Sequence, residues 1–192
     1  MSSRIPRLVL SFLPLLLLSL TACTNRANKL PNYGKVPDFS MTDSNDRPFT
    51  RKMLDGSVWV IDFIYTNCPA ACPRMTSKMH KLADQLEGDD NVGLLSISVD
   101  PDRDTPPVLT RFAQRYSGPT AHWHFLTGTP STVHLLAYTT FHVGDIIGKM
   151  EHGTYFILVD KNGEIRGYYS SFDAEAMQSL LEDVNALREA RS

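Results

Sequence analysis

The stretch that decides the fold is Ser57–Met75, SVWVIDFIYTNCPAACPRM. Its first ten residues form a β-branched and aromatic run that is almost continuously apolar, which is typical of a central strand buried on both faces. Cys68 and Cys72 follow this run, and each is followed by a proline. Because proline suits the first helical position, we expect a helix to begin at Pro73, with Cys72 as its cap. The two thiols would then lie on a loop at a helix N-terminus.

Such a position favours the thiolate form of cysteine over the thiol. A loop also allows the Cβ atoms to approach the roughly 3.5–4.5 Å of a disulfide, whereas positions four apart on a regular helix lie about 5–6 Å apart. Two thiolates are too few for a structural zinc site, but they suit a soft ion such as Cu(I) once an imidazole is added. Cys68 and Cys72 are therefore predicted to form both a reversible disulfide and a copper site.

The third ligand must be chosen among six histidines. His152 comes just before the apolar run TYFILVD (154–160), a strand that we expect to enter the sheet beside the first hairpin, and the polar loop before it could fold over the thiols. His122 and His124 share one face of a short strand, and His142 follows a helix pattern. Spacing alone favours His152 and leaves these alternatives open.

Strand and helix patterns alternate along the chain. The expected elements are a hairpin at 37–50 with its turn at 44–46, strands at 57–66, 92–100 and 122–126, and helices at 73–87, within 102–116 after a cap at Asp104 or Thr105, and at 130–141. A hairpin at 154–169 and a helix capped by Asp173 follow. This order predicts an α/β protein with a mixed central sheet flanked by helices. It resembles a thioredoxin-like fold with an N-terminal hairpin extension.

Acidic residues follow the second central strand, in DPDRDTP (100–106). The carboxyl ends of parallel strands meet at one edge of a sheet, which places Asp100 near Cys68. Asp100 is a candidate for orienting a ligand from outside the coordination sphere. Asp104 and Thr105 are better explained as turn and helix-cap residues.

The N-terminal residues 1–22 have the anatomy of an export signal, with two arginines before an apolar run too short to span a bilayer. The ending Leu-Thr-Ala-Cys resembles the lipobox of bacterial lipoproteins, which implies cleavage before Cys23 and lipidation of its thiol. We therefore expect a lipid-anchored protein on the extracytoplasmic face of a bacterial membrane, where disulfides persist. Residues 23–35 are expected to be a lipidated flexible tether, and 36–192 a single domain.

The charge of the chain argues against nucleic acid as a partner. The whole chain has 19 basic and 21 acidic residues, a net charge of −2. Removing Arg4 and Arg7 with the signal leaves 17 basic residues against 21 acidic ones, hence −4. Among the basic residues no patch interleaved with aromatic residues stands out.

The sequence resembles the Sco/SenC family of copper-binding, membrane-tethered, thioredoxin-like proteins. The resemblance rests on PDFSMTD, FIYTNCPAACPRMTSKM, LLSISVDPDRDTP, FLTGT and EHGTYFILVDKNGEIRGYY, in that order. It implies that Cys68, Cys72 and His152 bind one copper. It also implies a role in maturing the binuclear copper centre of cytochrome c oxidase, with that centre's subunit, an upstream copper donor and a thiol reductant as partners. Met150-Glu151 precede the histidine where we associate Val-Asp with the family.

Two other functions compete with a copper metallochaperone. A thiol–disulfide oxidoreductase would use Cys68 as nucleophile and Cys72 to resolve the mixed disulfide, although the spacing is Cys-x-x-x-Cys and His152 would have no task. A peroxidase ranks last, because Tyr65 stands where peroxiredoxins have a threonine. Tyr65 itself is interpreted as a core residue of the strand.

Overall fold

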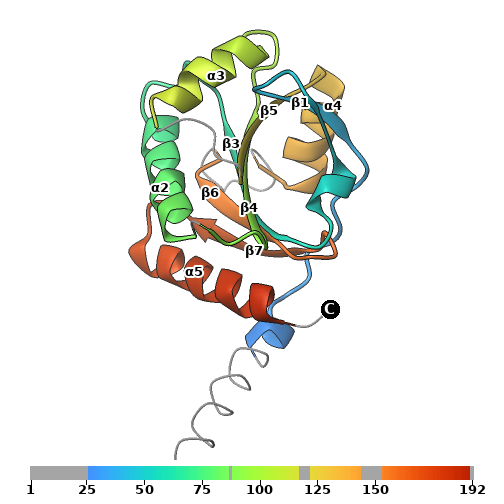
Figure 1. The fold of residues 1–192 in the computed structure, drawn as a ribbon, viewed down its shortest axis with the longest axis vertical. Helices are drawn as coiled ribbons and strands as arrows, with labels where there is room; N and C mark the ends of the chain where they lie inside the picture. The colour runs from blue at the N-terminus through green and yellow to red at the C-terminus, as the bar shows by residue number, and fades with distance from the viewer. Residues whose placement is uncertain (1–25, 87, 117–121, 144–152, 191–192) are drawn as a thin grey trace, which may run out of the picture.

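The computed structural model describes residues 26–190 except 87, 117–121 and 144–152. One mixed sheet of seven strands, ordered β2-β1-β5-β4-β3-β6-β7, runs through the molecule (Figure 1). The strands are β1 (Ser40–Asp43), β2 (Pro48–Thr50), β3 (Val58–Ile64), β4 (Val92–Ser98), β5 (Trp123–Thr127), β6 (Tyr155–Val159) and β7 (Ile165–Ser170). The helices are η1 (Arg51–Leu54), α2 (Ala71–Gln85), α3 (Pro106–Gln114), α4 (Pro130–His134), η2 (Leu135–Thr140) and α5 (Ala174–Glu189).

The pairing confirms a mixed sheet. Every residue of β3 and β4 is buried, and these two strands run parallel, as do β4 and β5. The first hairpin joins the far edge through β1 and β5, while β6 pairs with β3 and β7. The expectation that the strand after His152 enters beside the first hairpin is therefore wrong. That strand instead lies directly beside the strand that leads to the cysteines.

The two faces of the sheet bury separate apolar clusters. One cluster packs α2, α3 and α5 against residues such as Val60 and Phe125. The other packs the first hairpin, η1 and α4 with η2 against the opposite pleat, which includes Ile61 and Leu126. Residues one apart on a strand thus enter different clusters, as the period of two requires. Helices cover both faces, as the alternating pattern predicts.

The start of α2 differs from the expectation. The helix begins at Ala71, so Cys72 lies inside its first turn and Pro73 occupies the third helical position. Proline fits there because the first N–H groups of a helix have no acceptor within it. The prediction that Cys72 caps the helix is wrong, while the cap predicted at Asp173 is confirmed: its carboxylate accepts hydrogen bonds from two N–H groups in the first turn of α5.

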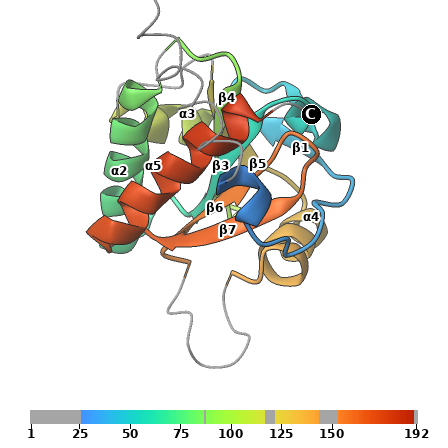
Figure 2. The same cartoon turned by 90° about the horizontal axis from the view of Figure 1, so that it is seen from below.

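The segment 26–35 is packed against the domain and does not form the flexible tether that was expected. Ala27 is only 4 % exposed, and Arg26 donates to the buried carboxylate of Asp183 at 2.5 Å. Arg166 donates to three backbone carbonyls of the segment. Figure 2 shows the segment beside α5 and β7. The packing unit therefore begins before residue 36, since these buried groups satisfy one another.

The predicted signal peptide and the predicted lipidation site, Cys23, lie outside the described residues. In the part of the chain that the structure describes, no helix is long and apolar enough to cross a membrane.

Arg26→Ala should lower the free energy of unfolding by about 1–2 kcal/mol, because the buried Asp183 carboxylate loses a charge-assisted hydrogen bond. The measurement is urea unfolding of residues 24–192. Lys29→Ala, at an exposed position of the same segment, is the control and should stay within about 0.5 kcal/mol of the unmodified chain. Equal stability of the two variants would contradict the docking.

Candidate metal and redox centre

The cysteine loop lies at the carboxyl end of β3 and leads directly into α2. The backbone N–H of Cys68 donates to the carbonyl of Tyr65 at 3.2 Å, which closes a turn. The N–H of Cys72, in the first turn of α2, donates to Cys68 Sγ at 3.3 Å. Both cysteines are free thiols in the structure. The helix N-terminus thus points its unpaired donors at the sulfur of Cys68, as a thiolate requires.

The two thiols differ in acidity. Burial raises the pKa of Cys68, but hydrogen bonds from the Cys72 and Ala70 N–H groups, the Cys72 thiol and the Tyr65 hydroxyl outweigh it and lower the pKa to about 7. Burial raises the pKa of Cys72 to about 12, and its interaction with Cys68 adds to the shift. At neutral pH, a thiol with a pKa of about 7 is about half ionised, so Cys68 is available as a thiolate while Cys72 keeps its proton.

Tyr65 is a functional residue that the sequence interpretation missed. It lies just past β3 and is 37 % exposed, so it is not a core residue of the strand. Its hydroxyl donates a hydrogen bond to Cys68, and this contact is the main cause of the raised pKa of Tyr65. The strand ends at Ile64, two residues before the end of the predicted strand at 57–66, and no pattern in the sequence marks that end.

Asp104 is a second residue of the centre whose role the sequence interpretation missed. Its buried carboxylate accepts hydrogen bonds from the Thr66 N–H at 3.0 Å, the Thr66 hydroxyl at 2.5 Å and the Ser98 hydroxyl at 2.6 Å. Of the two predicted caps of α3, Thr105 occupies the cap position. The Asp104 N–H closes the predicted turn with the Asp100 carbonyl, but its side chain faces inward, so Asp104 as the cap is wrong. Asp104 joins the cysteine loop to the end of β4.

Asp100 lies at the expected edge, just after β4. Its N–H donates to Ser98 Oγ at 3.1 Å, and its carboxylate accepts from Arg103 at 3.1 Å. The carboxylate is therefore engaged by an exposed arginine. A role in orienting a metal ligand stays a prediction.

Asp62 is a carboxylate inside the otherwise apolar strand β3. It is fully buried, and neither of its side-chain oxygens has a hydrogen-bond partner in the described part of the chain. Burial raises the pKa of Asp62 to about 7. The nearby Ser96 hydroxyl and the backbone lower the pKa and offset part of this effect, although neither makes a hydrogen bond to the carboxylate. Its charge also contributes to the raised pKa of Cys72. Protonation of Asp62 and of Cys72 is thus coupled.

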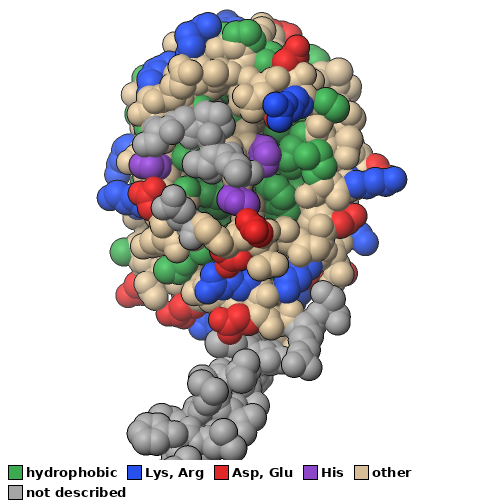
Figure 3. Space-filling view, in the orientation of Figure 1, with side chains coloured by type: hydrophobic (Ala, Val, Ile, Leu, Met, Phe, Trp, Pro, Cys, Tyr) green, Lys and Arg blue, Asp and Glu red, His purple; other side chains and the backbone are tan. Residues whose placement is uncertain are grey.

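His152 lies outside the described residues, so the structure does not place the proposed imidazole ligand. Histidine side chains gather on the face shown in Figure 3, next to exposed hydrophobic side chains. Among the described residues, no group of three or more His, Cys, Asp or Glu side chains is placed to hold a metal ion. The remaining histidines have neighbours of their own: His80 pairs with Asp84, His122 with Asp90, His124 packs on Phe49, His134 faces Tyr138, and His142 contacts the Tyr138 carbonyl.

Comparison with known proteins places this geometry in context. Residues 28–188 match the SCO1/SenC family model. The chain is similar to the crystal structure of a SCO1/SenC family lipoprotein from Bacillus anthracis, with 34 % identity and a TM-score of 0.73 over 83 % of this chain and 97 % of that one. This similarity confirms the predicted α/β fold.

Two further structures bear on the thiols. BsSco, a member of the Sco family of cytochrome c oxidase assembly proteins in which a disulfide switch was identified, is 30 % identical over 83 % of this chain and 96 % of its own, with a TM-score of 0.71. ScoI of Bradyrhizobium japonicum, solved with copper bound, is 27 % identical over 77 % of this chain and 98 % of its own, with a TM-score of 0.63.

Alkylation of reduced Cys68 should follow an apparent pKa of about 7, rising with pH as the thiolate forms. Tyr65→Phe removes one hydrogen bond to the thiolate, so it should shift the midpoint upward, toward the ordinary value of about 8.5. The measurement is the iodoacetamide rate between pH 5 and 10, with Tyr33→Phe as control. A midpoint near 8.5 in the unmodified chain would refute the activated thiolate.

Asp62→Asn should change how stability depends on pH. Between about pH 4 and pH 7 the unmodified chain holds a proton on Asp62 when folded and releases it when unfolded, so its stability falls as pH rises through this window. A shift of three pKa units corresponds to a loss of about 4 kcal/mol in the free energy of unfolding. The variant does not lose this stability as the pH rises, because asparagine does not titrate.

The stability of Asp62→Asn relative to the unmodified chain should therefore rise by up to about 4 kcal/mol from pH 4 to pH 8. Urea unfolding at both pH values measures it, with the half-buried Asp100→Asn as control. A constant difference at the two pH values would show that Asp62 does not titrate in this range.

Proposed function

Because the chain belongs to the SCO1/SenC family, we propose that it is an extracytoplasmic copper metallochaperone. It binds one copper through the thiolates of Cys68 and Cys72 and the imidazole of His152, and helps to mature the binuclear copper centre of cytochrome c oxidase. The observation that carries this proposal is the pair of free thiols at the start of α2, one of them poised as a thiolate at neutral pH.

The sheet topology supports His152 as the third ligand. Strand β3 runs toward Cys68, and β6 lies antiparallel beside it, with Ile61 opposite Ile157. The amino end of β6 therefore lies at the same edge of the sheet as the carboxyl end of β3. His152 precedes the first residue of β6, Tyr155, by three positions.

The two thiols suit the loading and release of Cu(I). The Cys68 thiolate binds the soft ion first, and the ion then displaces the proton of Cys72. Three ligands leave the copper open to an incoming thiolate. On delivery, new Cu–S bonds form to the recipient as the bonds to Cys68, Cys72 and His152 break, Cys72 takes up a proton again, and copper keeps its oxidation state.

A lipid on Cys23 would hold the domain at the membrane. The similar protein from Bacillus anthracis is a lipoprotein, and the packed unit begins by Arg26, only three residues later. The anchor and the domain are thus separated by a very short chain.

The difference in acidity between the thiols favours a second function, reduction of the recipient's cysteines. The Cys68 thiolate would attack the partner's disulfide, and Cys72, once deprotonated, would displace the partner's second sulfur. Two thiols of this chain become one disulfide while one disulfide of the partner becomes two thiols. A thiol reductant must then restore the pair. The disulfide switch of BsSco is consistent with this chemistry.

Anaerobic copper titration of reduced residues 24–192 tests the metal site. We expect one tight copper per chain, lost in Cys68→Ser. His152→Ala should change the sulfur-to-copper charge-transfer band of Cu(II) and weaken Cu(II) binding at least tenfold, while Cu(I) affinity falls less because the softer ion depends more on sulfur. His142→Ala, at an exposed position, is the matched control.

Absence of tight copper from the folded, reduced protein would refute the chaperone and favour the redox function. In cells, loss of oxidase assembly in both Cys68→Ser and His152→Ala would support copper binding. Loss in Cys68→Ser alone would support thiol exchange.

A further inference from the structure

The helix that bears Cys72 also carries a row of cations. Arg74, Lys78 and Lys81 are spaced by four and three residues on α2, so they lie on one face of the helix. Arg74 and Lys81 are exposed, and Lys78 is half-buried. The row begins two residues after Cys72 and leads away from the thiols. This positive charge is a local feature of α2, because the exported chain as a whole has a net charge of −4.

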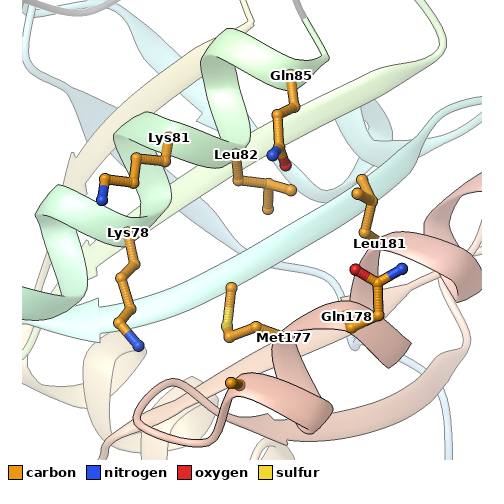
Figure 4. A pocket seen from close by; sticks show the side chains of 8 residues that line it. Lys78, Lys81, Leu82, Gln85, Met177, Gln178 and Leu181 are labelled. Carbon is orange, nitrogen blue, oxygen red and sulfur yellow. The ribbon is translucent and has the colours of Figure 1, made fainter.

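An apolar groove of about 310 Å³ lies beside this row, between α2 and α5. Figure 4 shows Lys78 and Lys81 along its α2 wall, with Met177 and Leu181 projecting from α5 and Leu82 between the helices. The other lining residues are Gln85, Ala174 and Gln178, so none of the eight is acidic. The groove therefore offers an apolar floor with a cationic rim.

An exposed aromatic ring connects the groove to the thiol end of α2. The Arg74 guanidinium lies 4.4 Å from the centroid of the Phe172 ring, and Lys78 Nζ lies 5.8 Å from it. Phe172 is 38 % exposed. Cations and apolar side chains thus form one continuous surface from the start of α2 to the groove.

We propose that this surface, the α2–α5 docking surface of Arg74, Lys78, Lys81, Met177 and Leu181, binds an acidic segment with an apolar side chain on the copper-receiving domain. The inference rests on the proposed function and names where the recipient docks. The apolar side chain enters the groove as the anchor of the contact, and the acidic groups meet the cationic rim.

Distances along the helix fit this arrangement. Lys78 and Lys81 are six and nine residues from Cys72, which corresponds to roughly 9 and 14 Å along α2. A standard interface covers about 800 Å² on each partner, a patch roughly 30 Å across. A recipient that reaches Cys68 therefore also covers this surface if it approaches from the α2 side.

The test measures Cu(I) transfer to the metal-free, reduced, soluble copper-centre domain of cytochrome c oxidase by rapid quench, separating the two proteins at each time and measuring the copper bound to the recipient. Lys78→Glu combined with Lys81→Glu should lower the second-order rate constant at least tenfold at about 20 mM salt. The difference should shrink at about 0.5 M salt, because exposed charges are then screened. Met177→Gln should slow transfer at both salt concentrations.

The matched control is Lys35→Glu combined with Lys52→Glu, which makes the same change in net charge at exposed positions. Lys52 lies on η1, which packs on the opposite face of the sheet from α2. Transfer by this control should equal that of the unmodified chain. Chelator competition should give the same Cu(I) affinity for all variants, so that any loss reports docking.

The outcomes separate the two proposals. No transfer by the unmodified, copper-loaded chain would overturn the chaperone and the docking surface together. Transfer that is equally fast in both double variants would overturn the docking surface alone. A third outcome is that the unmodified chain binds vesicles rich in phosphatidylglycerol, and that Lys78→Glu/Lys81→Glu loses this binding while copper transfer is unchanged. That outcome would assign the surface to membrane binding and overturn the proposal that the recipient docks there.

Discussion

The buried carboxylate of Asp104 is the constraint on which the thiol centre depends. It accepts hydrogen bonds from the backbone and hydroxyl of Thr66, two residues before Cys68, and from Ser98 at the end of β4. A carboxylate excluded from water needs such donors. Because it is satisfied only when the cysteine loop lies against β4, the position of the loop and the parallel pairing of β3 with β4 reinforce each other.

Once the loop is fixed, the start of α2 gives its two cysteines different properties. Cys68 lies ahead of the helix and receives N–H donors, whereas Cys72 lies inside the first turn and is covered by the core. The charge of Asp62 opposes ionisation of Cys72 as well. A copper ion bound to Cys68, or a mixed disulfide at Cys68, would remove the negative charge next to Cys72. Either event would therefore lower the pKa of Cys72 and favour loss of its proton.

The sequence predicts what depends on local patterns. The apolar run of β3, the turn at 44–46 and the cap at Asp173 follow from residue type and spacing, and the structure confirms them. It does not predict contacts between distant segments. Asp104 meets Thr66 across 38 positions, and Arg26 meets Asp183 across 157. Neither pairing leaves a periodic signal in the sequence. From the sequence, Asp104 is therefore interpreted as a helix cap, and the segment that begins at Arg26 as a flexible tether.

Helix α5 connects Arg26, three residues after the predicted lipidation site, to the proposed docking surface. Asp183 holds Arg26, and Met177, six residues earlier, lines the groove, a separation of roughly 9 Å along the helix. Three residues from Cys23 to Arg26 span at most about 11 Å. If Cys23 carries the lipid, the domain cannot swing freely on its anchor, and α5 stays close to the membrane surface. A recipient centre held by the same membrane would then meet the α2–α5 face from a restricted set of directions, which lowers the orientational cost of docking.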